Sequence, residues 1–212
     1  MSVNETQNVK IVVADPSALG LFGLAMVTLV ASSQKLGLTT GLSMILPWAI
    51  FLGGLAQLTA SLFDFKHNNI FGATAFGAFG LFWCGVAASW LIKLGYFGAA
   101  LATDIDAKQL GFAFIGYLIF SLYMTIGAME TNKVLFVIFI LIDFLLVGLS
   151  LDSFELGHGF AHNLAAWSEF LLSFASFYGS AGVVLNQHFG RSFVPMGKPF
   201  GIFKQAALLK AH

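Results

Sequence analysis

The chain has 212 residues, of which 58% are hydrophobic and only 9% are Asp, Glu, Lys or Arg. Soluble domains carry about 25% charged residues, so the composition excludes an ordinary soluble protein and indicates a surface that faces lipid. Ten basic residues balance ten acidic ones, and this neutral balance predicts no nucleic-acid partner.

Six apolar stretches are each long enough to cross a hydrocarbon core of about 30 Å, which takes roughly 20 helical residues. Their apolar runs are continuous and do not alternate with polar residues, which favours helices over barrel strands. The short connections predict one compact all-α bundle, with a cytoplasmic segment at 1–15, a six-helix transmembrane domain at 16–190 and a cytoplasmic tail at 191–212. The expected spans are 16–33, 39–63, 70–92, 110–129, 134–151 and 161–187.

The positions of Lys and Arg predict the orientation, because cytoplasmic loops are enriched in both. With the N-terminus inside, seven of these residues would be cytoplasmic and three would lie outside. Both termini are therefore expected in the cytoplasm. The first apolar run has no clear small-residue cleavage site, so no cleavable signal peptide is expected. The inside set is Lys10, Lys66, Lys133, Arg191, Lys198, Lys204 and Lys210, and the outside set is Lys35, Lys93 and Lys108.

The first span opens with Asp15 and Pro16, a typical N-cap followed by proline at the first helical position. A helix N-terminus carries partial positive charge and free N–H groups, so Asp15, Pro16, Leu19 and Gly20 form a candidate anion site. The alternative is an ordinary helix start, in which Asp15 occupies the cap and repels a carboxylate.

The second and third spans contain polar residues that could line a path. Gly53, Gln57 and Ser61 share one helix face at i, i+4 and i+8, and such a stripe either packs against a neighbouring helix or lines a wet passage. Gln57 favours the passage, because lipid cannot satisfy a mid-membrane amide. Thr74 is a weaker signal, since its hydroxyl can bond to its own helix backbone.

The fifth and sixth spans each contain an acid at membrane depth, Asp143 and Glu169. An ionised acid at the centre of a spanning helix costs about 2.5–3.5 kcal/mol, so both are expected to face the bundle or a cavity. Neither span supplies a Lys or Arg at mid-depth, which favours protonated acids or a hydrated surrounding. Each is a candidate for proton coupling or permeation, and the alternative is an interhelical hydrogen bond.

The sequence offers little support for catalysis. His158 and His162 have the i, i+4 spacing of a metal pair, but no glutamate lies between them and a place in an outer loop or at a helix start accounts for them as well. There is no Walker loop, no dinucleotide-binding glycine fingerprint and no nucleophile elbow. We therefore expect no enzyme, no metal site and no cofactor.

Three segments carry motifs in the order of a known membrane family. Residues 15–21 read Asp-Pro-Ser-Ala-Leu-Gly-Leu, close to Asn-Pro-x-Pro-Leu-Gly-Leu. Residues 51–83 contain Gly-Gly-x-Ala-Gln and Phe-Gly-x-Thr-Ala-Phe, and residues 185–191 read Leu-Asn-Gln-His-Phe-Gly-Arg, followed by Pro-Met-Gly at 195–197. Together they resemble the acetate uptake transporter family, which includes the bacterial succinate–acetate permeases. The resemblance covers nearly the whole chain.

The resemblance implies a hexamer of six-helix protomers in the plasma membrane of a bacterial or archaeal cell. Each protomer would pass acetate, and in some members succinate, through its own centre, by a channel-like or proton-coupled route. Matching residue by residue places an apolar constriction on Leu24, Phe79 and Ile142. The family often has Phe and Tyr at the first two of these positions, and this chain also departs from the motif at Asp15 and Ala18.

The resemblance and the chemistry of a small monocarboxylate lead to one expected mechanism. An apolar neck would admit the methyl group and penalise a hydrated ion by desolvation. Gln57, Thr74 and Asn186 are expected to replace part of the carboxylate's hydration, and Asp143 to exchange a proton with it. The main alternative is a hexameric channel for a neutral solute such as urea or a short amide, with flux indifferent to pH and membrane potential. A sensor or assembly subunit and a membrane enzyme are further alternatives.

Overall fold

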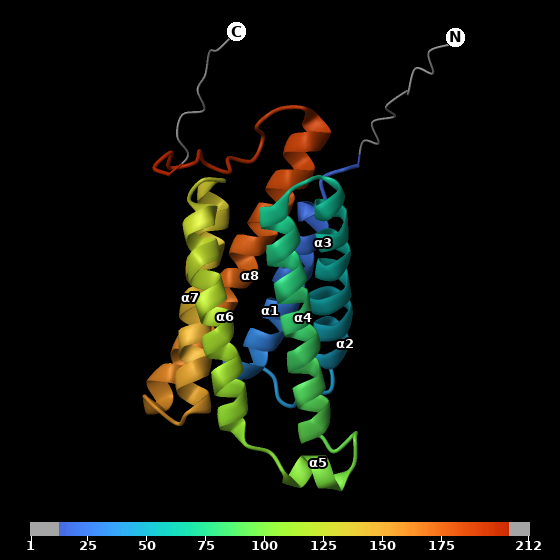
Figure 1. Cartoon of the computed structure of the whole chain (residues 1–212), viewed down its shortest axis with the longest axis vertical. Coiled ribbons are helices and arrows are strands. Elements are labelled where there is room, and N and C mark those ends of the chain that lie inside the picture. The colour runs from blue at the N-terminus through green and yellow to red at the C-terminus, as the bar shows by residue number, and fades with distance from the viewer. Residues whose placement is uncertain (1–12, 204–212) are drawn as a thin grey trace, which may run out of the picture.

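The computed structural model describes residues 13–203, which fold into a bundle of helices (Figure 1). Six segments of this part of the chain are long and apolar enough to span a membrane, so the predicted all-α fold with six spanning helices is confirmed. The expectations for Lys10, Lys204 and Lys210 fall outside the described residues. The six segments are α1 (Ser17–Lys35), a continuous segment Leu46–Lys66, α4 (Ile70–Lys93), α6 (Ala107–Ala128), α7 (Lys133–Ser153) and α8 (His158–Phe189).

Several boundaries differ from those expected. The second span begins at Leu46 rather than near residue 39, with Pro47 in its first turn, where proline needs no intrahelical N–H bond. The last span, α8, has 32 residues, or about 48 Å at 1.5 Å per residue. It begins after Gly157 and ends before Gly190, which both have positive φ. A short helix, α5 (Ala99–Thr103), lies in the connection between α4 and α6.

The second span is not a uniform α-helix. It consists of α2 (Leu46–Trp48), the π-helix η1 (Ala49–Ala56) and α3 (Gln57–Lys66). Within η1, Gly53 lies against the Trp83 ring, and a Cβ added at Gly53 would lie 2.7 Å from Trp83 Cγ. Stretches of π-helix occur frequently at functional sites, and this one ends directly before Gln57.

The helices form two groups. The first contains α1, the α2–η1–α3 segment and α4; the second contains α6, α7 and α8, and the two meet where α1 packs along α8. The backbones of α4 and α6 barely approach each other, so aromatic rings fill the space, such as Phe79 against Phe120 and Phe82 against Tyr117. The starts of α1, α4 and α7 lie at one end of the bundle and α5 at the other (Figure 1).

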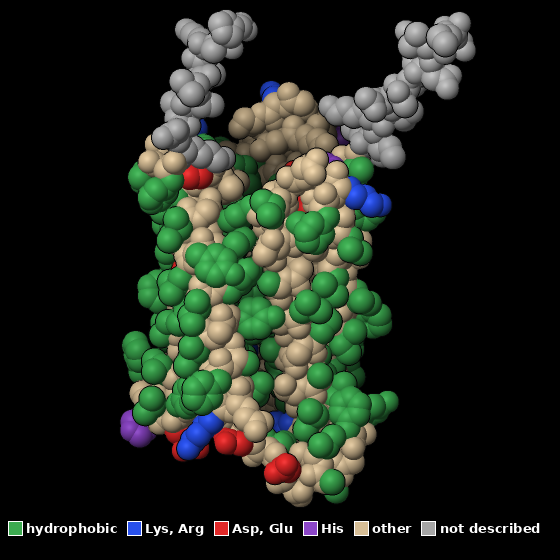
Figure 2. Space-filling model, viewed as in Figure 1, with side chains coloured by type: hydrophobic (Ala, Val, Ile, Leu, Met, Phe, Trp, Pro, Cys, Tyr) green, Lys and Arg blue, Asp and Glu red, His purple; other side chains and the backbone are tan. Residues whose placement is uncertain are grey.

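The surface agrees with a place in lipid. On the face shown in Figure 2, hydrophobic side chains cover the middle of the bundle, and Lys, Arg, Asp and Glu gather at its two ends. Such a distribution is typical of helices that cross a membrane, where charged groups remain near the interfaces. The protein is therefore a multi-pass membrane protein.

Close helix contact at Gly148 gives a prediction on stability. A Cβ added there would lie 2.6 Å from the backbone N of Ala165 in α8, so Gly148→Ala must push α7 away from α8 at a cost of about 1–3 kcal/mol. We expect a lower midpoint of thermal unfolding in detergent. The matched control is Gly85→Ala, because a Cβ at Gly85 meets nothing within 4 Å and alanine favours a helix. Equal midpoints for the two variants would contradict this packing.

Candidate functional site

A cavity of about 240 Å³ enters the bundle at the end where α1, α4 and α7 begin. Its mouth carries polar residues at these three helix starts: Asp15, which precedes α1, Asn69, the N-cap of α4, and Asn132, the N-cap of α7. Its inner wall is mainly apolar. Three helices point their N-terminal ends toward this mouth, and the side chains of Asp15, Asn69 and Asn132 accept hydrogen bonds from backbone N–H groups there.

The inner end of the cavity is closed by three apolar side chains from three helices. Leu24 on α1, Phe79 on α4 and Ile142 on α7 are 6%, 5% and 3% exposed, and all three line the cavity. The same three also line a second pocket of only about 10 Å³, on its side toward Thr28 and Leu172. They therefore separate a roomy cavity from a space that holds about one water molecule. We refer to Leu24, Phe79 and Ile142 as the neck.

Gln57 lies at the cavity wall, and its place in a substrate path stays a prediction. It is the first residue of α3, is almost fully buried and donates a hydrogen bond from Nε2 to the carbonyl oxygen of Gly53 at 2.9 Å. This bond orients the amide across the junction between η1 and α3. A buried amide beside the neck can offer hydrogen bonds to a polar solute that leaves water.

Two other polar residues that were expected in the path, Thr74 and Asn186, do not line this cavity. Thr74 is exposed on the outer face of α4, between the buried Ala73 and Ala75. Asn186 is engaged with the chain that follows α8: its Nδ2 donates to Val194 O at 2.9 Å, and its Oδ1 accepts from Phe193 N and Val194 N at 2.8 and 2.7 Å. Asn186 therefore fixes a turn and has no amide group directed at the cavity.

The segment after α8 contributes to the mouth, which sequence reasoning did not anticipate. Met196 lines the cavity, and its carbonyl oxygen accepts a hydrogen bond from Val134 N at 3.2 Å. Further along, Phe200 N donates to Met129 O at 2.8 Å. This segment thus crosses from the end of α8 to the start of α7. The Pro-Met-Gly motif at 195–197 was the available signal.

Asp143 lies beside the neck residue Ile142 but points to another side of α7. Its Oδ2 accepts a hydrogen bond from Thr125 Oγ1 of α6 at 2.7 Å, and Asp143 is absent from the cavity wall. Its Oδ1 has no hydrogen-bond partner among residues 13–203. The structure therefore shows the interhelical hydrogen bond that was the alternative, and proton exchange at Asp143 stays a prediction.

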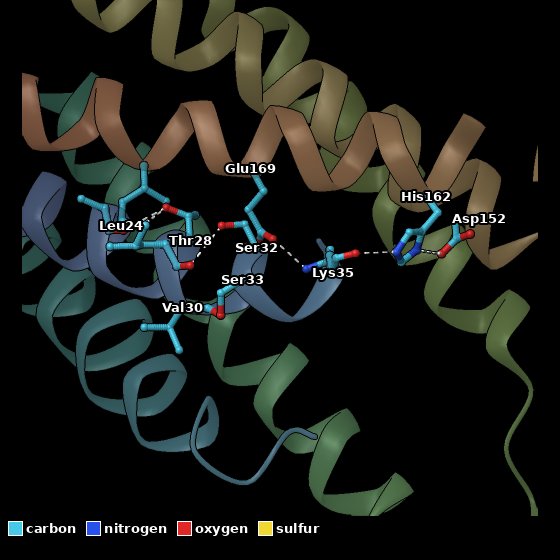
Figure 3. A network of polar contacts seen from close by, with 11 residues as sticks. Leu24, Thr28, Val30, Ser32, Ser33, Lys35, Asp152, His162 and Glu169 are labelled. Carbon is cyan, nitrogen blue, oxygen red and sulfur yellow. Dashed lines mark hydrogen bonds and ion pairs between the residues drawn. The ribbon is translucent and has the colours of Figure 1, made fainter. Parts of the chain in front are cut away.

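Glu169 has a cation beside it, which comes from another helix than its own. Lys35, the last residue of α1, extends its side chain to Glu169 Oε2, with the two charged atoms 2.7 Å apart (Figure 3). The sequence assigned Lys35 to the outer side of the membrane, and its contact with Glu169 on another helix was not anticipated. This ion pair joins α1 to α8 on the far side of the neck from the cavity.

Only one of the four residues proposed as an anion site at the start of α1 faces the cavity. Asp15 does, and its Oδ1 accepts a hydrogen bond from Ser17 N at 2.9 Å. Pro16 precedes the first helical residue, Leu19 is exposed, and Gly20 packs against the Phe76 ring. The carboxylate of Asp15 caps the helix start, so this structure favours the ordinary helix start over an anion site.

The sequence and the fold both match known membrane proteins. The sequence model of the GPR1/FUN34/yaaH family matches residues 2–196. The chain is 32% identical over 187 residues to the succinate-acetate/proton symporter SatP of Escherichia coli (strain K12). This alignment covers 87% of this chain and 96% of that protein. It is 30% identical over 146 residues to acetate permease A of Emericella nidulans, and this alignment covers 64% of this chain and 48% of that protein. The solved structure of the bacterial acetate channel SatP matches with a TM-score of 0.80 at 32% identity, over 88% of this chain and 100% of the solved chain.

Proposed function

Because the chain belongs to the GPR1/FUN34/yaaH family, we propose that it transports acetate, succinate and other small carboxylates across the plasma membrane, through the centre of each protomer. The names of its relatives support this substrate class. The observation that carries the proposal is the apolar neck at the end of a cavity with a polar mouth. In the cell, the protein is a hexamer in the cytoplasmic membrane of a bacterium or archaeon, with the cavity mouth and both termini in the cytoplasm.

The chemistry of the neck favours a small acid over a hydrated ion. Leu24, Phe79 and Ile142 offer no hydrogen bond from their side chains, so an ionised carboxylate would lose its hydration there without compensation. The neutral acid presents a methyl group and one hydroxyl, which cost far less to desolvate. We therefore propose that the carboxylate crosses the neck together with a proton, as the neutral acid. Gln57 then offers hydrogen bonds to this acid in the cavity.

Uptake of radiolabelled acetate into liposomes that contain the purified protein tests this function. We expect uptake above that of protein-free liposomes, stimulation by a proton gradient and competition by unlabelled short monocarboxylates. The main alternative, a channel for a neutral solute, predicts flux of urea or a short amide that ignores the pH gradient. Absence of acetate uptake, together with permeability to urea, would overturn the proposal in favour of that alternative.

A further inference from the structure

The ion pair between Lys35 and Glu169 is unusual for its place in an apolar bundle. The two side chains are 16% and 2% exposed, and Lys35 is the one Lys or Arg among residues 13–203 that is not exposed. The desolvation of two buried charges offsets much of the free energy of their attraction, so such a pair is weak evidence for stability. An ion pair retained at this place therefore calls for a functional explanation.

The pair lies on the line that leads away from the neck. On α1, Leu24, Thr28, Ser32 and Lys35 follow at intervals of four, four and three residues and share one face of the helix. Leu24 belongs to the neck and Thr28 lines the small pocket beyond it. Lys35 lies about 16 Å further along the axis than Leu24. Figure 3 shows Leu24, Thr28, Ser32 and Lys35 in this order along α1.

Helix α8, which packs along α1, carries the residues that face this row. Leu172 lines the small pocket with Thr28, and Glu169 is one turn nearer the start of α8. Thr28 and Ser32 are fully buried, and their hydroxyl groups donate to backbone carbonyl oxygens of α1, Thr28 to Leu24 and Ser32 to Leu29. A path that continued from the neck along α1 and α8 would therefore meet the ion pair next.

Three charged or titratable groups besides Glu169 face this region. Lys35 comes from α1, His162 from α8 itself and Asp152 from the end of α7. His162 Nε2 donates to the backbone oxygen of Lys35 at 2.9 Å, and its Nδ1 lies 3.5 Å from Asp152 Oδ2. His162 and Asp152 are half-exposed and hold the end of α1 through its backbone. Neither residue contacts the Lys35 ammonium group, which is bonded to Glu169.

We infer that Lys35 is a carboxylate-binding site on the outer side of the neck, which opens when Glu169 takes up a proton. This inference rests on the proposed transport of small carboxylates. A proton from outside converts the Glu169 carboxylate to the neutral acid and ends its ion pair. The Lys35 ammonium then pairs with an arriving substrate carboxylate, which takes the place of the Glu169 carboxylate.

The cycle closes without change to the protein. Glu169 passes its proton to the bound carboxylate, and the resulting neutral acid moves into the neck. The Glu169 carboxylate, now ionised again, re-forms the ion pair with Lys35 and prevents a second anion from binding there. One proton and one carboxylate thus cross together. Between cycles, the ion pair of Lys35 with Glu169 excludes unprotonated anions.

Glu169→Gln in liposomes is the first test. Glutamine cannot carry the proton and leaves Lys35 open to carboxylate. We expect acetate uptake to fall, because the anion held by Lys35 receives no proton before the neck. We also expect the stimulation of the remaining uptake by an inward proton gradient to fall by about fivefold or more relative to the unaltered protein. The control is Asp104→Asn, which removes an exposed acid near α5 and is expected to keep the full stimulation. Undiminished uptake and undiminished stimulation in a correctly folded Glu169→Gln protein would overturn the inference.

A second variant covers the case in which the unpaired lysine prevents folding. In Lys35→Met with Glu169→Leu, both charges are replaced by apolar groups of similar size, an exchange that bundles often tolerate. We expect a KM for acetate raised by about tenfold or more and no stimulation by the proton gradient. An unaltered KM and stimulation would overturn the inference while transport itself stands. Failure of the unaltered protein to take up acetate would overturn both this inference and the proposed function.

Discussion

Replacing Leu24 with tryptophan is expected to lower acetate uptake by about tenfold or more, a rise in the barrier of at least about 1.4 kcal/mol. Leu24, Phe79 and Ile142 already leave a pocket of only about 10 Å³ beside them. An indole ring at position 24 has no free volume to enter except the passage itself. Initial rates of radiolabelled acetate uptake into liposomes measure the effect.

The matched control for Leu24→Trp lies on the same helix. Phe22 is exposed on the outer surface of α1, and Phe22→Trp adds a similar ring without touching the neck. We expect uptake by this control to stay close to that of the unaltered protein. Equal uptake by Leu24→Trp and Phe22→Trp, with both proteins folded, would show that acetate does not pass Leu24.

Glutamate at position 57 is expected to reduce acetate uptake by about tenfold or more, with the largest loss at high pH. Gln57 is almost fully buried at the cavity wall, and an ionised carboxylate there repels an anionic substrate through a region of low dielectric constant. At lower pH the introduced carboxyl group would be neutral in part of the protein population, so uptake should recover. A pH series of uptake rates by Gln57→Glu measures both effects.

Gln57→Met separates loss of the amide from gain of a charge. Methionine keeps the length of the side chain but removes its hydrogen bond to Gly53. We expect a smaller loss of uptake than for glutamate, and no recovery on acidification. Should Gln57→Glu transport acetate at the unaltered rate at high pH, Gln57 would not face the substrate.

The number of spans could be predicted from the sequence because the membrane imposes a length and an apolar composition on each one. Details set by local geometry could not. The π-helix before Gln57 depends on packing such as that of Gly53 against Trp83, and no hydropathy pattern encodes it. The start of the second span at Leu46 likewise depends on the fold of residues 36–45.

The rotation of each helix about its own axis could not be predicted for the candidate site. In a soluble helix the polar face marks the outside, but both sides of a spanning helix are apolar, so periodicity is weak. Thr74 and Ala75 are neighbours in sequence, yet Thr74 is exposed and Ala75 lines the cavity. Ile142 and Asp143 are also neighbours in sequence, yet Ile142 lines the cavity and Asp143 is bonded to Thr125 of α6.

The contact between Lys35 and Glu169 depends on residues 134 positions apart in the sequence. The expected first span ended at residue 33, and the distribution of Lys and Arg assigned Lys35 to the outer side of the membrane. A long, flexible side chain at the end of α1 can reach back along the helix, and the packing of α8 against α1 brings Glu169 within its range. Neither span contains this information alone.

Thiol labelling at two adjacent positions tests most directly whether the path runs through the protomer past the neck. In a Cys84→Ser background, which removes the single cysteine of the chain, Ala75→Cys lies in the cavity wall and Thr74→Cys lies on the outer face of α4. Treatment with a negatively charged methanethiosulfonate from the cavity side should block acetate uptake by the Ala75→Cys protein, and excess acetate should slow this block. Uptake by the Thr74→Cys protein should not change. Full uptake by labelled Ala75→Cys, or a block at Thr74→Cys instead, would contradict a central path.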